Sequence, residues 1–416
     1  MNRITEHDRS IIRKLIEKKA EYAADTHNAQ RVKLWTKVND LEKCRPVVWV
    51  NEEPWTELAQ KHVGELTAQC DDSFLRSFEV GLKRELFRWR NYRADMVIEN
   101  ILLVPRSIDY GKLGMVTKER VIGNVNSDVE SHEFERIINT LNDVELMEIP
   151  AVSEDAAESS RRFDIIREIS RDLMPVELQG VSHQWFILWD MLIRWFGVEQ
   201  AMLDLVMNPE LIHAALDKLQ KGWLTRLDQF EDKKLLSSNV TNQRVGSGGY
   251  AYTKSLPLRT DKPVTSKDQW GCGNAQIFTS VSPEMHDEFS LKYEMEWLKR
   301  FGLVYYGCCE RLDIKMHLLK EIPNLRKVSC SVWADKEVMA DACRGKYVVS
   351  LKPNPASLAE DTWRPEEVRK EIGTDMKKLE GCNIEIILKD ISTCRGDVSR
   401  ISRWVDIASE LAGKNQ

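Results

Sequence analysis

The sequence contains no long apolar run and no concentration of basic residues. No run approaches the roughly 20 apolar residues that a membrane-spanning helix needs, and residues 1–8 have no apolar signal region. We therefore expect a cytoplasmic protein with no membrane contact. The 60 lysines and arginines are outnumbered by 66 aspartates and glutamates, which gives a net charge of −6. Without a basic stripe, the sequence argues against a nucleic-acid partner.

The nine cysteines lack the CxxC spacing of a zinc ribbon. Stable disulfides are rare in the cytoplasm, and a metal site would have to be assembled from separate strands. Tryptophan, by contrast, is abundant at 13 residues, and several stand near the ends of expected strands, namely Trp49, Trp55, Trp270 and Trp333. Such aromatic surface suits a flat organic ligand, and core packing is the other explanation.

The alternation of helices and strands in the C-terminal half predicts an α/β fold. Each buried strand follows an amphipathic helix, as in βαβ units with a parallel sheet. These strands are expected at residues 302–308, 326–332, 346–352 and 384–389, after earlier strands at 45–50 and 96–104. At 416 residues the favoured closed form is a (β/α)8 TIM barrel. We expect an N-terminal helical extension over residues 1–44 and one barrel domain over 45–416.

Helix signals fill the remaining parts of the chain. Residues 5–42 have the spacing of two amphipathic helices, and a strongly apolar helix is expected at 183–196. Asn208-Pro209 and Ser282-Pro283 are typical helix starts, because a polar cap precedes a proline at the first helical position.

The strand at 302–308 runs directly into two thiols and a carboxylate, Cys308, Cys309 and Glu310. In a barrel, chemistry collects at the carboxyl ends of the strands. Because side chains alternate along a strand, Tyr306, Cys308 and Glu310 are expected on one face. That face would carry a soft and a hard metal ligand. Free cysteines are also often small buried hydrophobic residues, so a structural role stays open.

Several segments resemble, in order and spacing, the uroporphyrinogen decarboxylase superfamily from about residue 45 to the C-terminus. They are Arg45-Pro-Val-Val-Trp49 and residues 94–105, 196–213 and 281–289. The decarboxylases of that superfamily hold a tetrapyrrole with an arginine-rich loop after the first strand. Here that loop is Asn51-Glu-Glu-Pro-Trp55, and Asn100 takes the place of the family's aspartate. Glu52 and its neighbour would repel a polycarboxylate, so porphyrin decarboxylation is disfavoured.

The other branch comprises cobalamin-linked methyltransferases, which bind zinc through a His-x-Cys-Gly element and a cysteine after the last strand. The resemblance assigns Cys308 and Cys394 as zinc ligands, with Tyr306 in the place of the histidine and Glu310 completing the set. The Tyr-Gly-Cys-Cys-Glu version is similar to a subgroup linked to O-demethylation. It implies methyl transfer from a methoxylated aromatic to the cobalt of a small corrinoid protein, with zinc or a proton donor activating the ether oxygen.

Candidate site residues follow from strand ends and from this resemblance. Glu310, Asn100 and His183 are the catalytic candidates. The substrate-binding candidates are Asn51, Glu52, Trp55, Trp270, Gln276, Trp333 and Lys352, and the metal candidates are Cys308, Glu310 and Cys394. Each polar side chain could instead bind a loop backbone, the histidine and tryptophans could be core residues, and Lys352 could pair with Asp390 between strands.

Two other functions stay open at this point. One is a decarboxylase or lyase that acts on a small organic acid, and the other is a non-catalytic protein that binds a corrinoid or tetrapyrrole. The sequence leaves the methyl donor and the oligomeric state open, a homodimer included.

Overall fold

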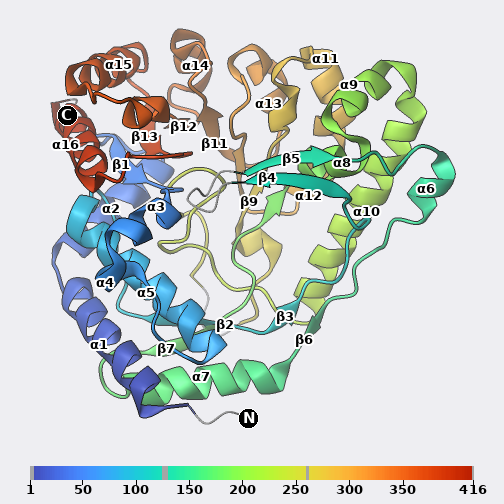
Figure 1. The fold of residues 1–416 in the computed structure, drawn as a ribbon. Coiled ribbons are helices and arrows are strands. Elements are labelled where there is room, and N and C mark those ends of the chain that lie inside the picture. The colour runs from blue at the N-terminus through green and yellow to red at the C-terminus, as the bar shows by residue number, and fades with distance from the viewer. Residues whose placement is uncertain (1–3, 124–129, 259–261, 415–416) are drawn as a thin grey trace.

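Seven parallel strands form the main sheet of the computed structural model, which describes residues 4–123, 130–258 and 262–414 (Figure 1). The strand order is β1-β13-β12-β11-β10-β9-β8, and every neighbouring pair is parallel. The strands are β1 (Val47–Val50), β8 (Trp185–Phe186), β9 (Trp270–Gly273), β10 (Leu303–Tyr306), β11 (Leu325–Cys330), β12 (Val348–Leu351) and β13 (Asn383–Leu388). The predicted α/β class with a parallel sheet is confirmed.

A second parallel pair forms a separate two-stranded sheet. Strand β2 (Leu102–Pro105) pairs with β7 (Val176–Gln179), and the chain after β7 continues into β8 of the main sheet. On the other side, the backbone N–H of Asp95 donates to the Val48 carbonyl of β1 at 3.1 Å, yet no strand ladder joins β1 to β2 in the described residues. The arrangement is TIM-barrel-like, with an irregular join between its first two strands.

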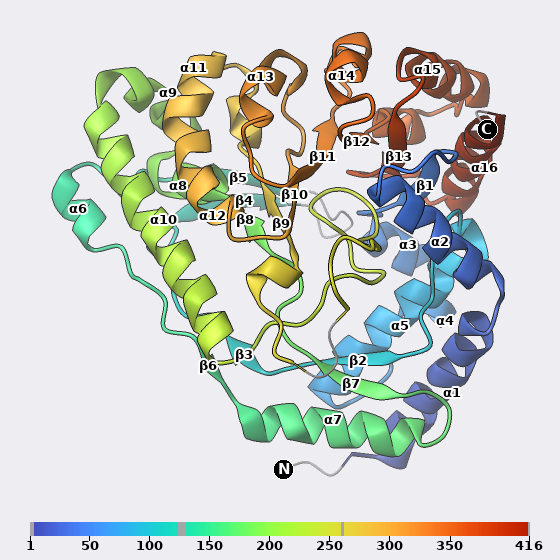
Figure 2. The same ribbon diagram turned by 180° about the vertical axis from the view of Figure 1, so that it is seen from behind.

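Helices surround these strands on the outside in both views (Figures 1 and 2). They are α1 (Glu6–Ala23), α2 (His27–Asn39), α3 (Trp55–Lys61), α4 (Val63–Leu66), α5 (Ser73–Tyr92), α6 (Leu141–Glu145), α7 (Ala156–Ser170), α8 (Leu188–Phe196), α9 (Val198–Met207), α10 (Pro209–Asp232), α11 (Pro283–His286), α12 (Lys292–Leu298), α13 (Met316–Leu319), α14 (Lys336–Cys343), α15 (Pro365–Lys378) and α16 (Val398–Lys414). Short antiparallel pairs join β3 (Ile108–Asp109) to β6 (Ser153–Glu154) and β4 (Glu119–Gly123) to β5 (Glu130–Phe134). No helix in the described ranges is long and apolar enough to cross a bilayer.

The two N-terminal helices form as expected and pack into the domain. Ile12 and Ile16 of α1 are buried in a core shared with α5, β2 and α7. Trp35 of α2 is fully buried, and its indole N–H donates to the Asp95 carbonyl at 2.8 Å. Ser282 caps α11 by accepting from the Met285 N–H, as predicted, whereas the side chain of Asn208 before α10 donates to Asp204 instead of capping.

Two predicted boundaries are wrong for reasons of tertiary structure. The strand expected from residue 96 begins at Leu102, because the backbone N–H of Ile98 donates to the Asn28 side chain of α2 rather than to a strand. The helix expected from residue 183 begins at Leu188, because Trp185 and the next residue form β8 against β9.

A glycine-rich loop crosses the space that the strands enclose, and it is drawn in yellow-green across the middle of Figure 2. Its Gly249 N–H donates to Glu385 of β13 at 3.2 Å. A Cβ atom at Gly248 would lie 2.3 Å from the same carboxylate, so only glycine allows this approach. Glu385 in turn pairs with Lys327 of β11 at 2.8 Å, and both side chains are fully buried.

Candidate functional site

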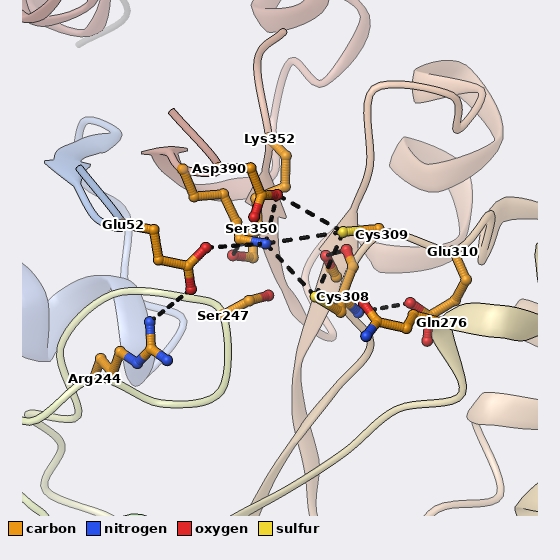
Figure 3. A network of polar contacts seen from close by, with 12 residues as sticks. Glu52, Arg244, Ser247, Gln276, Cys308, Cys309, Glu310, Ser350, Lys352 and Asp390 are labelled. Atoms are coloured by element: carbon orange, nitrogen blue, oxygen red, sulfur yellow. Dashed lines mark hydrogen bonds and ion pairs between the residues drawn. The ribbon is translucent and has the colours of Figure 1, made fainter. Parts of the chain in front are cut away.

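Side chains from several loops meet at the carboxyl ends of the parallel strands (Figure 3). Glu52 follows β1, Cys308 and Cys309 follow β10, and Lys389 and Asp390 follow β13. Because the strands are parallel, the loops at their carboxyl ends lie at one edge of the sheet.

A turn at Gly307 directs the two thiols. Strand β10 ends at Tyr306, and Gly307 has a φ of 99°, a conformation that favours glycine. The period-two alternation therefore stops there, and the prediction that Tyr306, Cys308 and Glu310 share one face is wrong. The Tyr306 hydroxyl points to Glu294 on α12, whereas the Glu310 carboxylate accepts from the backbone N–H of Cys308 at 2.8 Å.

The Lys389 ammonium lies at the centre of the group. Its Nζ is 3.6 Å from Cys308 Sγ, 3.8 Å from Cys309 Sγ, 2.7 Å from an Asp390 carboxylate oxygen and 3.5 Å from a Glu52 carboxylate oxygen. Glu52 and Asp390 both have positive φ, at 58° and 55°. Left-handed backbone is uncommon for residues that carry a Cβ, and it collects at functional sites.

These contacts set the charge states of the acids and the lysine. Burial alone would lower the pKa of Lys389, but the thiols and carboxylates around it raise that pKa, so the ammonium form is held. Burial alone would raise the pKa of Glu52, but the Lys389 charge and hydrogen bonds from Asp390 and Arg244 lower it to about 2. The pKa of Asp390 is raised, by burial first and by the nearby Glu52 charge.

The two thiols differ from each other. Their sulfur atoms are 3.6 Å apart, and Cys308 is buried whereas Cys309 is exposed. The hydrogen bond between them lowers the pKa of Cys309, with help from the Lys389 charge and against the effect of burial. The same hydrogen bond and burial raise the pKa of Cys308. Cys309 is therefore the more acidic of the two thiols, and the thiolate is the form of cysteine that reacts and binds metals.

A small cavity of about 190 Å³ opens beside this group. Its lining includes the polar side chains of Lys389, Asp390 and both thiols, and the apolar side chains of Val332, Trp333, Pro353 and Pro355. Trp333 is 72% exposed, so its ring is accessible at the rim. Lys352, a predicted substrate-binding residue, also lines this cavity, but its Nζ donates to Tyr305 and Ser350. Burial lowers the pKa of Lys352 to about 8.

Arg244 lines a larger cavity of about 790 Å³ and donates to Glu52 at 2.9 Å. Glu52 also pairs with Lys389, so the chain Arg244–Glu52–Lys389 connects the linings of the two cavities. The predicted residue Asn51 also lines the larger cavity, together with Trp49, and the buried Asn51 side-chain nitrogen has no hydrogen-bond partner in the described structure.

A second polar atom without a partner in the described structure belongs to Ser331, which lines the small cavity. Its buried hydroxyl likewise lacks a partner among the described residues. Buried polar atoms are normally satisfied, so these two unpaired atoms beside the cavities are exceptions to that rule.

The predicted zinc ligands do not assemble. Besides the Cys308 N–H, the Glu310 carboxylate accepts from the Ala275 N–H at 3.2 Å, and it is fully buried. The Cys394 thiol donates to Glu57 at 3.1 Å. No group of three or more His, Cys, Asp or Glu side chains in the described ranges is arranged to hold a metal ion. The donor set that the resemblance assigned therefore does not fit zinc in this structure.

Other predicted residues lie outside both cavities. Trp55 is packed on Phe87 and under Arg88, and the Trp270 indole N–H donates to the Ala251 carbonyl at 3.0 Å, so both are core residues. Gln276 donates to both carboxylate oxygens of Asp190 at 3.1 Å.

The two remaining catalytic candidates, Asn100 and His183, are exposed. Asn100 lies in the bend before β2, at the opposite end of that strand from its carboxyl end, and the ring of His183 lies 3.3 Å from the Arg244 carbonyl.

Sequence reasoning missed the two cations of the site. Lys389 is the last residue of the strand expected at 384–389, and at this strand end only Asp390 was named, as a possible partner of Lys352. A lysine that directly follows a buried strand indicates a candidate site residue at the carboxyl end of that strand. Arg244 precedes the run Val-Gly-Ser-Gly-Gly, and that run is a signal for a loop which approaches other backbone closely.

A buried polar chain lies behind the thiols. Lys315 donates to Nδ1 of His286 at 3.0 Å, which leaves the proton of this ring on Nε2, 2.7 Å from the Tyr306 hydroxyl. The Tyr306 hydroxyl then donates to Glu294 at 2.5 Å. Burial and the Lys315 charge lower the pKa of His286 to about 3, and burial raises the pKa of Glu294 to about 8. The place that the family gives to a zinc-binding histidine is thus used for structure.

Comparison with known proteins supports the architecture. No protein-family model and no curated protein matches the sequence. Among solved structures, the fold is similar to that of a methyltransferase from Methanosarcina mazei, with a TM-score of 0.51 and 10% sequence identity. The match covers 90% of this chain and 97% of that chain. The likeness thus extends over nearly the whole of both chains, and at this identity it establishes a shared fold.

Proposed function

We propose that this protein is a methyltransferase that moves a methyl group from a methoxylated aromatic compound to the cobalt of a small corrinoid protein. The observation that carries the proposal is the small cavity, whose lining combines apolar side chains with a lysine ammonium and two thiols. The shared fold with a methyltransferase, and the resemblance of the sequence to O-demethylating enzymes, support the same reaction class.

The cavity has the two parts that this chemistry needs. The Trp333 ring, Pro353 and Pro355 offer a flat apolar surface to one aromatic ring. Lys389 and Cys309 line the same cavity, and a methoxy oxygen on that ring would lie beside them. An aryloxide is a poor leaving group, so cleavage of the methyl–oxygen bond requires a cation or a proton donor at that oxygen.

The partner would approach from the open side of the cavity. The carboxyl ends of the strands form this edge of the sheet, and the exposed Trp333 lines the cavity there. A corrinoid protein that docks here would bring its cobalt toward the methyl carbon from the side opposite the leaving oxygen. The cobalamin belongs to that partner, and this chain supplies the binding pocket and the cation at the ether oxygen.

Methyl transfer to reduced free cobalamin tests the proposal. Purified protein, cob(I)alamin and a panel of methoxylated phenols and benzoates are incubated without oxygen, and methylcobalamin is followed by its visible spectrum. We expect methylcobalamin to accumulate with at least one methoxylated compound, and Trp333→Ala to raise KM more than it lowers kcat. The variant Trp363→Ala is a control outside the cavity. If no compound yields methylcobalamin, with or without a corrinoid protein encoded beside the gene, the proposal fails.

A further inference from the structure

The Lys389 ammonium is surrounded by side chains of the kinds that bind metal ions, arranged here around a nitrogen atom rather than for a metal. Two thiols and two carboxylates face its ammonium at 2.7 to 3.8 Å. Thiolate and carboxylate are the ligand types that zinc takes in proteins. The side chain is only 6% exposed, so these four groups rather than water surround its charge.

The distance between the two sulfur atoms is also close to that of two thiolates bound to one metal ion. Two thiolates on one tetrahedral zinc, each at about 2.3 Å, lie about 3.8 Å apart. The measured separation of Cys308 Sγ and Cys309 Sγ is 3.6 Å, and the Lys389 Nζ is nearly equidistant from them. The sulfur pair therefore has the separation of a bidentate metal ligand, but it faces an ammonium group.

We propose that the Lys389 ammonium is the resident cation of this site and takes the place of a metal ion. A lysine so held is a fixed positive charge that is present without loading, and Asp390 and Glu52 keep it protonated and aimed at the cavity. Lys352, the second lysine of the cavity, has no such surroundings, because its Nζ is bound to Tyr305 and Ser350. The assignment thus singles out one of two neighbouring lysines.

The role of this cation in catalysis rests on the proposed function. As the methyl–oxygen bond of the aryl ether breaks, its electron pair stays on the oxygen, and the Lys389 ammonium stabilises the negative charge that develops there. The methyl group passes to the reduced corrinoid of the partner, whose cobalt supplies the electron pair of the new bond. The aryloxide leaves and takes a proton from water, while Lys389 keeps its own proton.

The cation assignment can be tested without any methyl donor. Removing the ammonium should free the four groups for a soft metal, so Lys389→Ala is titrated with Cd²⁺ and followed by thiolate-to-cadmium absorption. We expect one Cd²⁺ per chain, bound at least about tenfold more tightly than by the wild type, since the ammonium competes for the same groups. Lys389→Arg keeps the charge, and Lys352→Ala removes the neighbouring lysine; both should bind like the wild type. Adding Cys309→Ser to Lys389→Ala should abolish the absorption.

Three results would overturn the assignment. The first is equal cadmium affinity of the wild type and Lys389→Ala, and the second is a folded Lys389→Ala, checked by circular dichroism, that binds no cadmium. The third comes from the wild type alone and holds even if Lys389→Ala does not fold: a chelator that removes bound zinc and thereby speeds alkylation of Cys309. We expect instead that a chelator leaves the alkylation rate unchanged. Because these readouts need no turnover, the cation assignment can fail or stand separately from the methyl transfer reaction.

Discussion

Replacing Tyr306 by phenylalanine removes one oxygen atom from the buried chain behind the thiols. In the wild type this oxygen accepts the Nε2 proton of His286 and donates its own proton to Glu294. All three side chains are fully buried, so water cannot take over either contact. The substitution keeps the ring and its packing, and it leaves one donor and one acceptor without partners.

The size of the effect follows from those two groups. A buried donor or acceptor left without a partner costs about 1–3 kcal/mol, so we expect Tyr306→Phe to lower the free energy of unfolding by about 2–6 kcal/mol. The assay is equilibrium unfolding in urea, followed by tryptophan fluorescence. Tyr110→Phe is the control, because that tyrosine is 45% exposed, and its change should stay within about 0.5 kcal/mol.

The same variant tests whether Tyr306 only stabilises the fold or also takes part in the thiol site. Its hydroxyl contacts the helices behind the sheet and not the thiols, so alkylation of Cys309 in the folded variant should proceed at the wild-type rate. A loss below about 1 kcal/mol would show that the chain Lys315–His286–Tyr306–Glu294 is not the satisfied network described here. A changed alkylation rate would place Tyr306 in the thiol site.

Three further predictions concern the interior. Glu385→Gln leaves the buried Lys327 ammonium without its counter-charge and should destabilise the fold by about 3–5 kcal/mol in urea unfolding; an unchanged midpoint would contradict this. Gly248→Ala places a Cβ 2.3 Å from the Glu385 carboxylate and should cost about 1–3 kcal/mol, whereas Gly81→Ala in α5 meets nothing within 4 Å and should stabilise by about 0.5–1 kcal/mol. The pKa of Glu294 is raised from 4.5 to about 8, so the native state holds an extra proton between these values and this carboxyl's stabilising contribution is lost as pH rises through that window. We expect thermal melts to show a falling slope of up to about 1.4 kcal/mol per pH unit that Glu294→Gln removes.

Much of the fold could be predicted because the core strands carry their own signal. The apolar runs that became β10 to β13 are short, β-branched and separated by amphipathic helices, and a parallel sheet follows from that order alone. The join between β1 and β2 could not be predicted in the same way. The segment before Leu102 is just as apolar, but the Ile98 backbone binds the Asn28 side chain from a distant helix, and local sequence does not show such a partner.

The location of the site could be predicted from the sequence better than the directions of its side chains. Strand ends indicated Glu52, Cys308 and Lys352, and all three lie at the carboxyl edge of the sheet. The direction of each side chain was not predictable, because it depends on the positive φ of Gly307 and on backbone N–H groups that capture Glu310. Family likeness also suggested a metal, whereas the lysine that occupies the centre follows a different strand.

The most direct measurement is methyl transfer to cob(I)alamin in the presence of a strong metal chelator, with wild-type protein and Lys389→Ala compared side by side on one methoxylated substrate. We expect the chelator to leave the wild-type rate unchanged and the loss of the ammonium to lower kcat by about 10²–10³-fold, the usual contribution of one fixed donor at a developing negative charge. A wild-type rate that the chelator abolishes and zinc restores would contradict the account, as would a Lys389→Ala variant that keeps the full rate.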